Sequence, residues 1–575
     1  MRSSVDILKE CFAEISKTEE VIRVDSIPNV DTDGYICVWK LISEVLVNER
    51  VETVELFFAF CKSFPYTLPE IYFPNNQFGY IPHLDISTSK LCIAPDDSIY
   101  DISDCSSLLK QCIMSSLRLI EEGLKANAQA YVDEINSYWN IPEKMEPDVD
   151  VFWELHGSIP DKSLLLDAVT YNKDIEINGK SHTANICVIF YGEEDNSTRN
   201  YINKLKNSYS TDVLFVSSFV LPLSPPYNMT FSRFLQCISD PDDIKLIKNY
   251  INKNKEGKLI FRLSETTFGG IVIKPVVGQR RGFRVSTVNS YYVLNHFEYK
   301  HMNLQRVYGK IFSPARICIR TSGNEMVEKK FGIAGLGSIG SNLSFFLSGW
   351  HNSQLMLIDD DILTIDNIGR HFLGYIHTKS SKVDALAKHF IDINPSRKVF
   401  PIKSNIQDVI YSQIDKLNTL DAIFICTGNL MSELCVIDNL LANNLNIPVF
   451  IIWVEPYCIA GHMLYINPKF CAKSLELFSP SGLKLYKYNL IADDEYKDYS
   501  KFTKRDSGCN SEYTNYSGND IILFLSAIYP IINKLIEKPT NSNAYRWVGN
   551  TKLAETKDIK LKELPITDQV QIFKV

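Results

Sequence analysis

The sequence predicts a multidomain chain of α/β and α+β class whose carboxyl-terminal part forms a doubly wound sheet. Three observations support this prediction. The chain has 575 residues, enough for about three or four domains. Strand-like and helix-like runs alternate after residue 301, as in a parallel sheet covered by helices. A glycine-rich turn joins one of these strands to its helix, and such a turn marks a ligand site in sheets of this kind.

Composition and charge narrow the class of protein. The chain is 45% apolar and 22% charged, with a formal net charge of −8, so a role in nucleic-acid binding is disfavoured. The best candidate for a membrane span, Ile521–Ile532, is short and contains Pro530. The 14 cysteines are scattered, with no Cys-x-x-Cys pair, which argues against a zinc site and a disulfide scaffold. We expect a cytoplasmic protein that binds neither nucleic acid nor membrane and carries no signal peptide.

The first two parts of the chain are predicted from hydrophobic patterning. Residues 1–145 read as an α+β domain, and residues 150–300 as a mixed α/β middle domain with no motif that indicates a chemistry. A linker is expected at Pro142–Pro147. The helix-like and strand-like runs on which this division depends are Val5–Ile15, Tyr35–Leu46, Thr53–Phe60, Ser106–Ala128, Ile186–Tyr191, Val213–Leu221, Ile244–Asn252 and Gly270–Val277.

Residues 301–575 carry a nucleotide-site pattern. The apolar run Phe331–Ala334 leads into Gly335, Gly337 and Gly340, and a helix-like segment follows. The glycines permit a tight turn and close approach of phosphate, and the helix N-terminus favours negative charge. The next apolar run, Gln354–Ile358, ends at Asp359, nineteen residues after Gly340, where an acid is placed for a ribose hydroxyl.

Polar and charged residues beyond Asp359 indicate which reaction the nucleotide site supports. Asn367, Arg370 and Lys382 follow it, and Asn394-Pro395 comes later. Hydride transfer needs no such cations. Adenylyl transfer does, because charge on the phosphates and on the leaving pyrophosphate must be neutralised.

This block resembles the ThiF/MoeB-type adenylation domain of ubiquitin-activating enzymes, a Rossmann-like doubly wound fold. The resemblance implies that ATP and Mg²⁺ bind here. It also implies that Asp359 holds the ribose, that Asp361 lies by the metal, and that Asn367, Arg370 and Lys382 contact the triphosphate. His371 stands where the family has Gln.

One position departs from the family pattern. After the run Asp421–Thr427 the family has an Asp that helps to hold magnesium, but this chain has Gly428. Asp361 remains as the carboxylate that magnesium prefers. The alternative interpretation is a degenerate fold that binds a nucleotide without catalysis.

Cys509 is the first candidate nucleophile. It lies in a polar stretch near residues 500–515, and Lys504 and Arg505 precede it; nearby cations favour the thiolate. With the Tyr516–Asp520 helix start behind it, this stretch resembles the catalytic-cysteine region of activating enzymes. The resemblance implies that its thiolate attacks the acyl-adenylate to give a thioester and AMP. An ordinary loop cysteine is the alternative.

Cys92 is the second candidate. The stretch Phe64–Pro74 and the run Leu91-Cys92-Ile93 resemble the ubiquitin-conjugating fold. Pro82-His83 replaces the family's His-Pro-Asn, so the Asn that would stabilise the oxyanion is missing; such a loss costs about 3–4 kcal/mol elsewhere. A backbone amide, Ser87 or Thr88 is a possible substitute, and a catalytically silent domain is the alternative. His83 is expected to be structural, and the nearby acids Asp96, Asp97 and Asp101 are expected to form a solvated loop rather than to orient an amine.

Three arginines are weaker candidates. In the adenylation family an arginine upstream of the glycine loop often reaches the ATP of a dimer partner. Arg306, Arg316 and Arg320 precede the loop here, and each is expected to be a surface residue unless it takes this role.

A conjugating-like unit followed by an activating-like unit resembles the fused proteins of bacterial CBASS antiphage operons. The resemblance implies that the C-terminus of a cGAS-like nucleotidyltransferase is adenylated, passed to Cys509 and then to Cys92, and joined to a target amine. It also implies a homodimer. A non-catalytic scaffold and an NAD-dependent Rossmann oxidoreductase with an added domain remain as alternatives.

Overall fold

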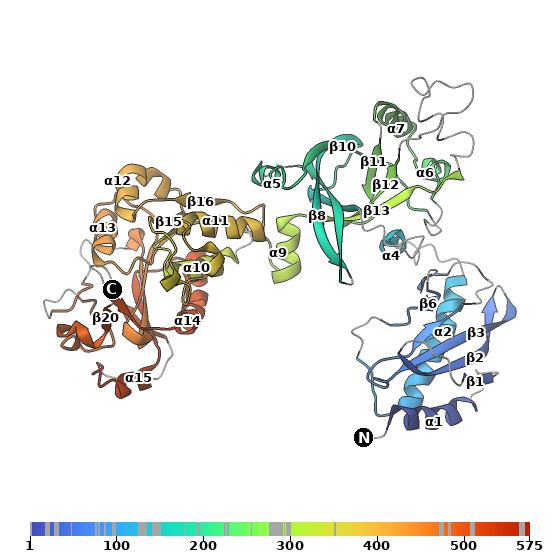
Figure 1. The fold of residues 1–575 in the computed structure, drawn as a ribbon, viewed down its shortest axis with the longest axis horizontal. Coiled ribbons are helices and arrows are strands. Elements are labelled where there is room, and N and C mark those ends of the chain that lie inside the picture. The colour runs from blue at the N-terminus through green and yellow to red at the C-terminus, as the bar shows by residue number, and fades with distance from the viewer. Residues whose placement is uncertain are drawn as a thin grey trace. The chain divides into compact units, whose positions relative to one another are not determined.

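The fold is taken from a computed structural model (Figure 1). The structure describes residues 3–17, 23–27, 34–47, 49–74, 78, 81–85, 88–94, 99–124, 135–140, 151–177, 179–192, 196–222, 226, 229–254, 256–274, 291, 294, 301–349, 352–470, 476–480, 485–505, 512–562 and 570–575. The chain divides into two compact units, one of residues 1–194 and 202–312, the other of residues 195–201 and 313–575.

The amino-terminal part is an α+β domain built on one sheet, as predicted. Its strands pair antiparallel in the order β1-β2-β3-β4-β6-β5. Two helices share one apolar core with this sheet, α1 through Leu8 and Ile15 and α2 through Ile113 and Ile120. The elements are α1 (Ser4–Ile15), β1 (Arg23–Ile27), β2 (Tyr35–Val47), β3 (Arg50–Cys61), β4 (Glu70–Tyr72), β5 (Leu84–Asp85), β6 (Lys90–Leu91) and α2 (Cys105–Leu124).

The middle part is a closed barrel. Seven strands join in the order β10-β11-β12-β13-β7-β9-β8, and β8 closes the ring by pairing with β10. The expected strand Val213–Leu221 is shorter than predicted and ends at Phe215. The elements are α4 (Ile135–Asn140), β7 (Val151–Gly157), β8 (Leu164–Ile177), β9 (Lys180–Tyr191), α5 (Asn196–Ile202), β10 (Tyr209–Phe215), α6 (Phe231–Gln236), α7 (Pro241–Lys253), β11 (Gly257–Arg262), β12 (Thr267–Ile273) and β13 (Gln305–Phe312).

The carboxyl-terminal part is a doubly wound sheet of eight strands in the order β16-β15-β14-β17-β18-β19-β22-β23. The first five are parallel and the last three antiparallel. Helices α10, α11 and α14 share a core on one face, and α12 and α13 on the other. This confirms the predicted fold class.

The elements of this third part start with α9 (Pro314–Ser322), β14 (Glu328–Ala334), α10 (Ser338–Ser348), β15 (Asn352–Ile358), η3 (Ile365–Asn367), η4 (Tyr375–His377), α11 (Lys382–Ile393), β16 (Val399–Ile402), α12 (Ile406–Leu417), β17 (Ala422–Ile425), α13 (Leu430–Leu441), β18 (Val449–Val454) and η5 (Pro456–Cys458). They continue with β19 (Ala460–Ile466), η6 (Pro468–Phe470), η7 (Glu495–Lys497), η8 (Tyr499–Lys501), β20 (Thr503–Arg505), β21 (Glu512–Thr514), α14 (Gly518–Glu537), β22 (Asn543–Val548), α15 (Thr551–Thr556) and β23 (Val570–Lys574).

Helix α14 corrects one expectation from the sequence. The apolar run judged too short to span a membrane belongs to a helix of 20 residues that continues through Pro530. By length and composition alone, α14 is the one helix among the described residues that could cross a bilayer. Its residues Ile521, Phe524 and Ile528 are fully buried and belong to the same core as β14 and β17, a position that a core helix occupies.

Candidate functional site

The glycine turn between β14 and α10 is shaped by two backbone contacts. Gly335 has a φ of +84°, and a Cβ there would lie 2.7 Å from the backbone nitrogen of Thr427. A Cβ on Gly340 would lie 1.9 Å from the carbonyl oxygen of Gly335. Both positions therefore require glycine.

The third glycine leaves room in front of helix α10. A Cβ on Gly337 would meet no atom within 4 Å, and Gly337 caps α10 without a side-chain hydrogen bond. The first backbone N–H groups of a helix have no partner within the helix and can bind an anion, and Gly337 leaves space beside them.

Asp359 lies at the carboxyl end of β15, as predicted, and is only 8% exposed. Its Oδ2 accepts a hydrogen bond from the Leu336 N–H at 2.6 Å, and its Oδ1 accepts one from the Asp361 N–H at 2.8 Å. The carboxylate thus joins the glycine turn to the loop after β15. A carboxylate that is held by two backbone donors is fixed in position for a ligand.

Lys382 brings a positive charge to the same place. It is the first residue of α11, and its Nζ lies 2.6 Å from Asp361 Oδ2 and 3.6 Å from Asp359 Oδ1. Its side chain is 8% exposed, whereas the Asp361 side chain is 69% exposed. The carboxylates of Asp359, Asp360 and Asp361 each offer an oxygen within 4.8 Å of the others, a donor set that fits a hard cation.

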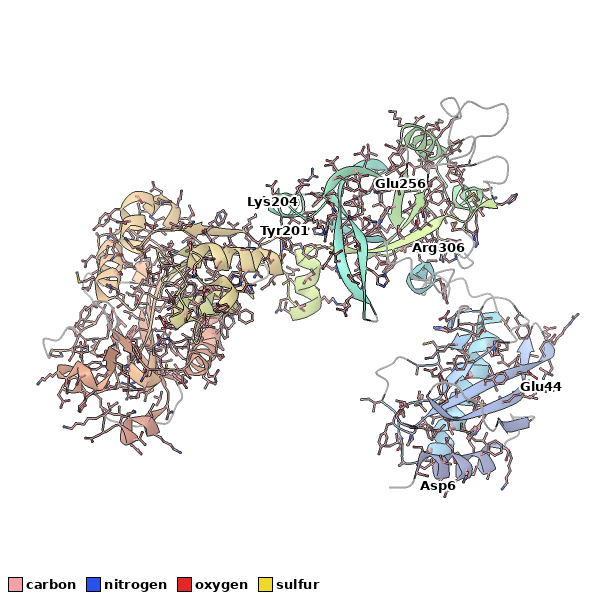
Figure 2. All side chains as sticks on the ribbon, viewed as in Figure 1. Asp6, Glu44, Tyr201, Lys204, Glu256 and Arg306 are labelled. Carbon is pink, nitrogen blue, oxygen red and sulfur yellow. The ribbon has the colours of Figure 1, made fainter. Side chains whose placement is uncertain are left out.

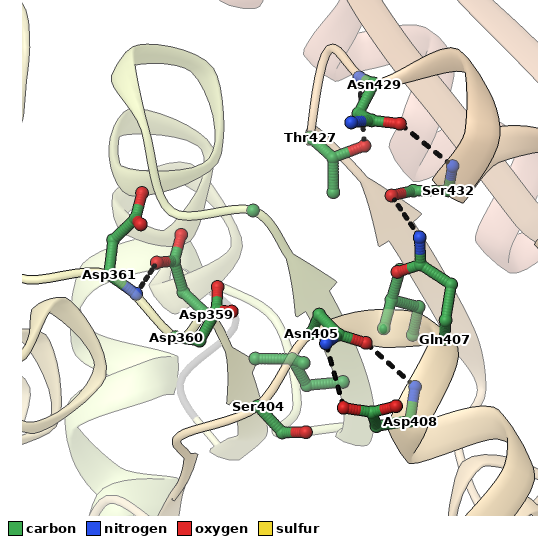
Figure 3. Close-up of a pocket in the computed structure, with 13 residues that line it drawn as sticks. Asp359, Asp360, Asp361, Ser404, Asn405, Gln407, Asp408, Thr427, Asn429 and Ser432 are labelled. Carbon is green, nitrogen blue, oxygen red and sulfur yellow. Dashed lines mark hydrogen bonds between the residues drawn. The ribbon is translucent and has the colours of Figure 1, made fainter. Parts of the chain in front are cut away.

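A pocket of about 500 Å³ opens beside these acids (Figure 3). Its other walls come from the start of α12 and from the turn after β17, where the Gln407 amide donates to the Ser432 hydroxyl at 2.9 Å. Asn405 and Asn429 cap α12 and α13. The lining residues on these walls, absent from the sequence-based prediction, are Ser404, Asn405, Gln407, Asp408, Thr427, Asn429 and Ser432.

A second pocket, of about 300 Å³, lies on the other side of the glycine turn and includes Gly337, Asn367 and Arg370 in its lining. The Arg370 Nη1 donates to the Thr514 carbonyl oxygen at 2.9 Å, and its guanidinium lies 4.4 Å from the centre of the Tyr516 ring. The Asn367 Oδ1 accepts from both the N–H and the hydroxyl of Thr364. Six of the eight nucleotide-site residues predicted from the sequence thus line two adjoining pockets. The other two lie just behind the linings, Lys382 against Asp361 and Gly340 against Gly335.

His371 supports the turn rather than a ligand. It is 7% exposed, its Nδ1 accepts from the Leu373 N–H, and its Nε2 lies 3.0 Å from the Leu336 carbonyl oxygen. Because Nδ1 is an acceptor, Nε2 carries the proton and donates it. Burial lowers the pKa of His371 to about 4, so the ring is neutral at pH 7 and holds the backbone of the glycine turn.

The structure offers no substitute at Gly428 for the aspartate of the family pattern. It has a φ of +59°, and a Cβ there would meet nothing within 4 Å. Its neighbour Asn429 uses its side chain to accept the N–H groups of Met431 and Ser432. Neither residue therefore replaces the missing carboxylate, and Asp361 is the exposed acid that remains beside Lys382.

Cys509 lies outside the described residues, so its predicted role stays a prediction. The strands on either side of it, β20 and β21, pair with each other from Thr503↔Thr514 to Arg505↔Glu512. Thr514, at the end of β21, accepts the bond from Arg370. The end of β21 therefore lies at the wall of the second pocket.

A buried glutamate anchors the segment before β20. Glu455 is 2% exposed, and its carboxylate lies 2.6 Å from His462 Nε2. The same carboxylate accepts from the backbone N–H groups of Leu490 and Ile491 and from the Tyr496 hydroxyl. No sequence pattern predicts this network, because the partners of Glu455 are 7 to 41 residues away along the chain.

Cys92 is exposed and follows β6. Its N–H donates to the His83 carbonyl oxygen at 2.9 Å, and its Sγ lies 3.6 Å from the Ala94 carbonyl oxygen. His83 has a φ of +64° and donates its own N–H to the Tyr138 hydroxyl. These contacts involve only the backbone of His83, so the structural role predicted for its side chain stays a prediction.

Of the two side chains proposed to replace the missing Asn, the structure describes only Thr88. The Thr88 hydroxyl donates to Asp85 at 2.9 Å and is thus engaged, whereas Ser87 lies outside the described residues. Hydrogen bonds from the Ser103 hydroxyl and then from the Ser103 N–H lower the pKa of the exposed Asp101 carboxyl. Asp96 and Asp97 lie outside the described residues. The contact of Asp101 is that of a surface turn.

A polar cluster that the sequence did not predict forms around Glu70 in the same sheet. Glu70 accepts hydrogen bonds from the Tyr35 and Tyr72 hydroxyls, and Lys90 pairs with it at 3.0 Å. The bonds from Tyr35 and Tyr72 lower the pKa of the Glu70 carboxyl to about 2. Lys90 belongs to β6 and stands two residues before Cys92, which follows the strand.

The three candidate arginines have different surroundings. Arg306 lies in the barrel, where its Nη1 donates to the Tyr138 carbonyl oxygen at 2.9 Å and its guanidinium lies 5.9 Å from the Trp139 ring centre. Arg306 is therefore not an exposed surface residue. Arg316 and Arg320 lie on α9, where Arg320 is exposed, as expected of a surface residue, and Arg316 is half-buried.

A glycine turn, a buried ribose-type acid, a lysine and an arginine at the carboxyl ends of parallel strands define a nucleotide-binding domain of the doubly wound class. Comparison with protein families narrows this class. Residues 317–479 match the ThiF family, and residues 37–146 match Prokaryotic E2 family B. The chain thus joins a domain of the activating type to one of the conjugating type, which confirms the fused organisation that the sequence predicted. Cys92 lies inside the second match and Cys509 outside the first.

Relatives of known annotation are distant. The chain is similar to ubiquitin-like modifier-activating enzyme 5 of Culex quinquefasciatus, with 26% identity over 171 residues, 28% of this chain and 43% of that protein. It is also similar to the ATP-dependent ubiquitin transferase-like protein Cap2 of Pseudomonas aeruginosa, with 34% identity over 99 residues, 16% of this chain and 18% of that protein. The chain thus matches less than half the length of these relatives.

Solved structures add little. E. coli MccB with MccA-N7isoASN resembles 42% of this chain and 67% of its own chain, at a TM-score of 0.30 and 16% identity. A likeness of this size carries no argument about function.

Proposed function

We propose that this chain uses ATP to activate the C-terminal carboxylate of a protein and passes the acyl group to Cys509, then to Cys92 and finally to an amine. The observation that carries the proposal is the position of Lys382. Its cation sits within 3.6 Å of the buried Asp359 at the foot of the glycine turn, while Arg370 lines the adjoining pocket. Two cations beside a phosphate turn suit adenylyl transfer, whose charge develops on phosphate oxygens.

The two pockets divide the nucleotide between them in this proposal. The larger pocket takes the nucleoside, because Asp359 offers its wall a carboxylate for the ribose hydroxyls. The phosphates lie before the N-terminus of α10, where Asn367 and Arg370 line the second pocket and Lys382 approaches from beside Asp359. Asp361 is the residue that would hold Mg²⁺, which would neutralise phosphate charge and the leaving pyrophosphate.

Adenylation and the first thiol transfer follow from ordinary acyl chemistry. A carboxylate oxygen of the protein tail attacks the α-phosphorus, the bond to the β-phosphate oxygen breaks, and pyrophosphate leaves with its electron pair. The Cys509 thiolate then attacks the carbonyl carbon of the acyl-adenylate, and AMP leaves. This second step has support from β21, which ends at the wall of the pocket where the adenylate forms.

The remaining two steps belong to Cys92. Its thiolate attacks the thioester carbonyl and releases the Cys509 thiolate, and a target amine then displaces Cys92 to form an amide bond. The exposure of Cys92 supports this role, because a protein amine must reach it. Tethering both domains on one chain raises the effective concentration of the second thiol to about the millimolar range for a suitable linker.

The partner proposed is a cGAS-like nucleotidyltransferase, whose C-terminus would be the activated tail in a CBASS antiphage system. The similarity to a protein named as an ATP-dependent ubiquitin transferase-like Cap2 supports this choice. A cytoplasmic homodimer is the proposed state of the enzyme. The neighbouring genes, a cyclase and a JAB-type peptidase, are the expected genomic setting.

A non-catalytic scaffold is the second candidate, favoured by Gly428 and by the absent oxyanion asparagine before Cys92. An NAD-dependent oxidoreductase is the third, but it leaves the cations of Arg370 and Lys382 without a task.

The test is ATP–pyrophosphate exchange in the presence of the nucleotidyltransferase, followed by non-reducing gels of the reaction. We expect exchange in the wild-type chain and a thiol-sensitive adduct with the tail. The Cys509→Ala variant should exchange label yet form no adduct, and Cys92→Ala should stop after the first thioester.

Two results would oppose the proposal. Binding of NAD in preference to ATP, measured by calorimetry, would favour the oxidoreductase. No exchange with the cognate tail, in a chain that still binds ATP, would favour the scaffold. A thioester on Cys92 in the Cys509→Ala variant would overturn the order of transfer alone.

A further inference from the structure

The middle barrel contains its own pocket, whose lining residues differ from those of the nucleotide site. Most of the barrel interior is filled by apolar side chains such as Leu155, Ile189 and Ile260, as in small barrels generally. One end is not filled and encloses about 260 Å³. The pocket is lined by Trp153, Thr170, Asn185, Cys187, Tyr209, Glu256, Lys258, Val272, Lys274 and Gln305; Figure 2 labels Glu256 in this part of the chain.

Lys258 is the unusual member of this set. It stands two residues before Ile260 on β11 and pairs with Val272 across the sheet, so its side chain faces the interior. Only 8% of the residue is exposed. Among the described carboxylates none forms an ion pair with it, and the contact of its Nζ is the face of the Tyr209 ring at 5.9 Å. A lysine buried to this degree normally has an anionic partner.

Two further polar groups line the same space. The Trp153 Nε1 is fully enclosed and makes no hydrogen bond. The Thr170 hydroxyl is equally enclosed, and the Cys187 thiol across the strand pair is its hydrogen-bond partner. Trp153 is 2% exposed and Thr170 is 3% exposed. Buried donors are nearly always paired in proteins, and each unpaired donor costs free energy.

The chemistry of the lining selects the ligand. The buried donors are the Lys258 ammonium, the Trp153 indole N–H and the Thr170 hydroxyl, and the exposed rim adds Lys274. One acid, Glu256, opposes two lysines, and it lies at the exposed rim. The floor around these donors is apolar, formed by the Trp153 ring, Cys187 and Val272.

We propose that the barrel mouth binds a carboxylate that carries a short apolar group. The carboxylate oxygens accept from Lys258, Trp153 and Thr170, and the apolar group covers the floor. The volume is smaller than the roughly 300–1,000 Å³ of pockets for drug-sized ligands, so the ligand is a small organic acid or the last residue of a protein tail. This inference does not depend on the proposed function.

The experiment follows the indole N–H resonance of Trp153 in the full chain labelled with ¹⁵N, assigned by its loss in Trp153→Phe. Four probes are titrated up to about 10 mM: succinate, an N-acetylated tripeptide of alanine with a free carboxylate, the same tripeptide as its carboxamide, and inorganic phosphate. We expect a saturable shift of this resonance with succinate, the free tripeptide or both. The response to succinate alone identifies a free acid, and the response to the tripeptide identifies a protein tail.

Variants separate a binding site from a structural lysine. Lys258→Met should weaken binding at least tenfold and slow amide hydrogen exchange in β11 of the ligand-free chain, because it removes an unpaired buried charge. A structural lysine would give faster exchange. Lys310→Met, which removes an exposed lysine from β13 of the same barrel, is the matched control and should change neither.

Three outcomes would overturn the inference. The first is a Trp153 resonance that no probe moves, which leaves the pocket to water. The second is equal binding of the carboxamide, and the third is phosphate binding as tightly as succinate.

Discussion

The carboxyl-terminal part, here called the nucleotide unit, and the amino-terminal conjugating-like part differ in how many contacts hold their candidate site residues in place. In the first, the side chains of Lys382 and Asp359 are 8% and 7% exposed; they form an ion pair, and Asp359 accepts a hydrogen bond from the glycine turn. In the second, Cys92 stands exposed, with one backbone hydrogen bond and a weak contact of its sulfur. A step that stabilises charge on phosphates needs fixed groups, whereas a thiol that a protein amine must reach needs access. The missing groups around Cys92 are therefore expected from the docked partner.

The largest expected effect tests the exposure of Cys92. Burial raises the pKa of Cys112 to about 11, so about one molecule in 10⁴ carries its thiolate at pH 7. Iodoacetamide should therefore modify Cys92 at least about 1,000 times faster than Cys112, with peptide mass spectrometry as the measurement. Equal rates in the denatured chain serve as the control, and a Cys92 as slow as Cys112 would break the comparison.

Removal of the buried cation is the next largest effect. Lys382→Met leaves Asp359 buried without its cation and removes a group that neutralises phosphate charge, so ATP–pyrophosphate exchange should fall about 100- to 1,000-fold. Lys388→Met is the matched control, since Lys388 is exposed on the same helix. Exchange within a few-fold of wild type in Lys382→Met would show that the nucleotide site is no better built than the Cys92 site.

A pH effect sharpens the comparison further. The pKa of His371 is about 4 in the folded chain and about 6.5 when unfolded, so the unfolded state binds more protons between these values. The contribution of His371 to the free energy of unfolding is fully present above about pH 6.5. It is lost as the pH drops toward 4, by about 2 kcal/mol between pH 7.5 and pH 5.

We expect this loss to lower the thermal midpoint of the nucleotide unit by about 4–8 °C. His371→Gln, which restores the residue of the family pattern, should remove most of that shift. His301→Gln, at an exposed histidine, should keep it. A shift of equal size in His371→Gln would assign the pH dependence to other groups.

The smallest expected effect concerns the link between the second pocket and β21. Arg370→Lys keeps a cation but loses the planar group that bonds Thr514 and stacks on Tyr516. Thioester formation should therefore fall about tenfold while exchange falls only a few-fold. The two rates are measured on one preparation by rapid quench. A parallel loss of both rates would show that Arg370 serves the phosphates alone.

The sequence predicted the parts of the site that local spacing determines. Gly335, Asp359 and Lys382 follow one another along two consecutive strand–helix units, so the periodicity of those units places them together. The predicted Asn367 and Arg370 also line a pocket, because they lie in the loop between the same units. The fold class of the first and third parts followed from similar local patterns.

Other parts depend on pairings that a single sequence does not reveal. Thr514 and Tyr516 reach Arg370 across 144 or more residues, and Gln407 meets Ser432 only because α12 and α13 pack side by side. Closure of the barrel needs the parallel pair of β7 and β13, which are separated by more than 140 residues. Such contacts depend on strand order, which hydrophobic periodicity leaves open.

Helix α14 makes the nucleotide unit prone to aggregation when that unit unfolds. Its twenty residues have a mean hydropathy of 1.4 in the most apolar window, and its buried face supplies six side chains to the core. An unfolded unit would present this long apolar segment to its neighbours, and such segments associate faster than they refold. Heat inactivation is therefore expected to be irreversible and to depend on scan rate, with added nucleotide protecting the chain by delaying the first opening.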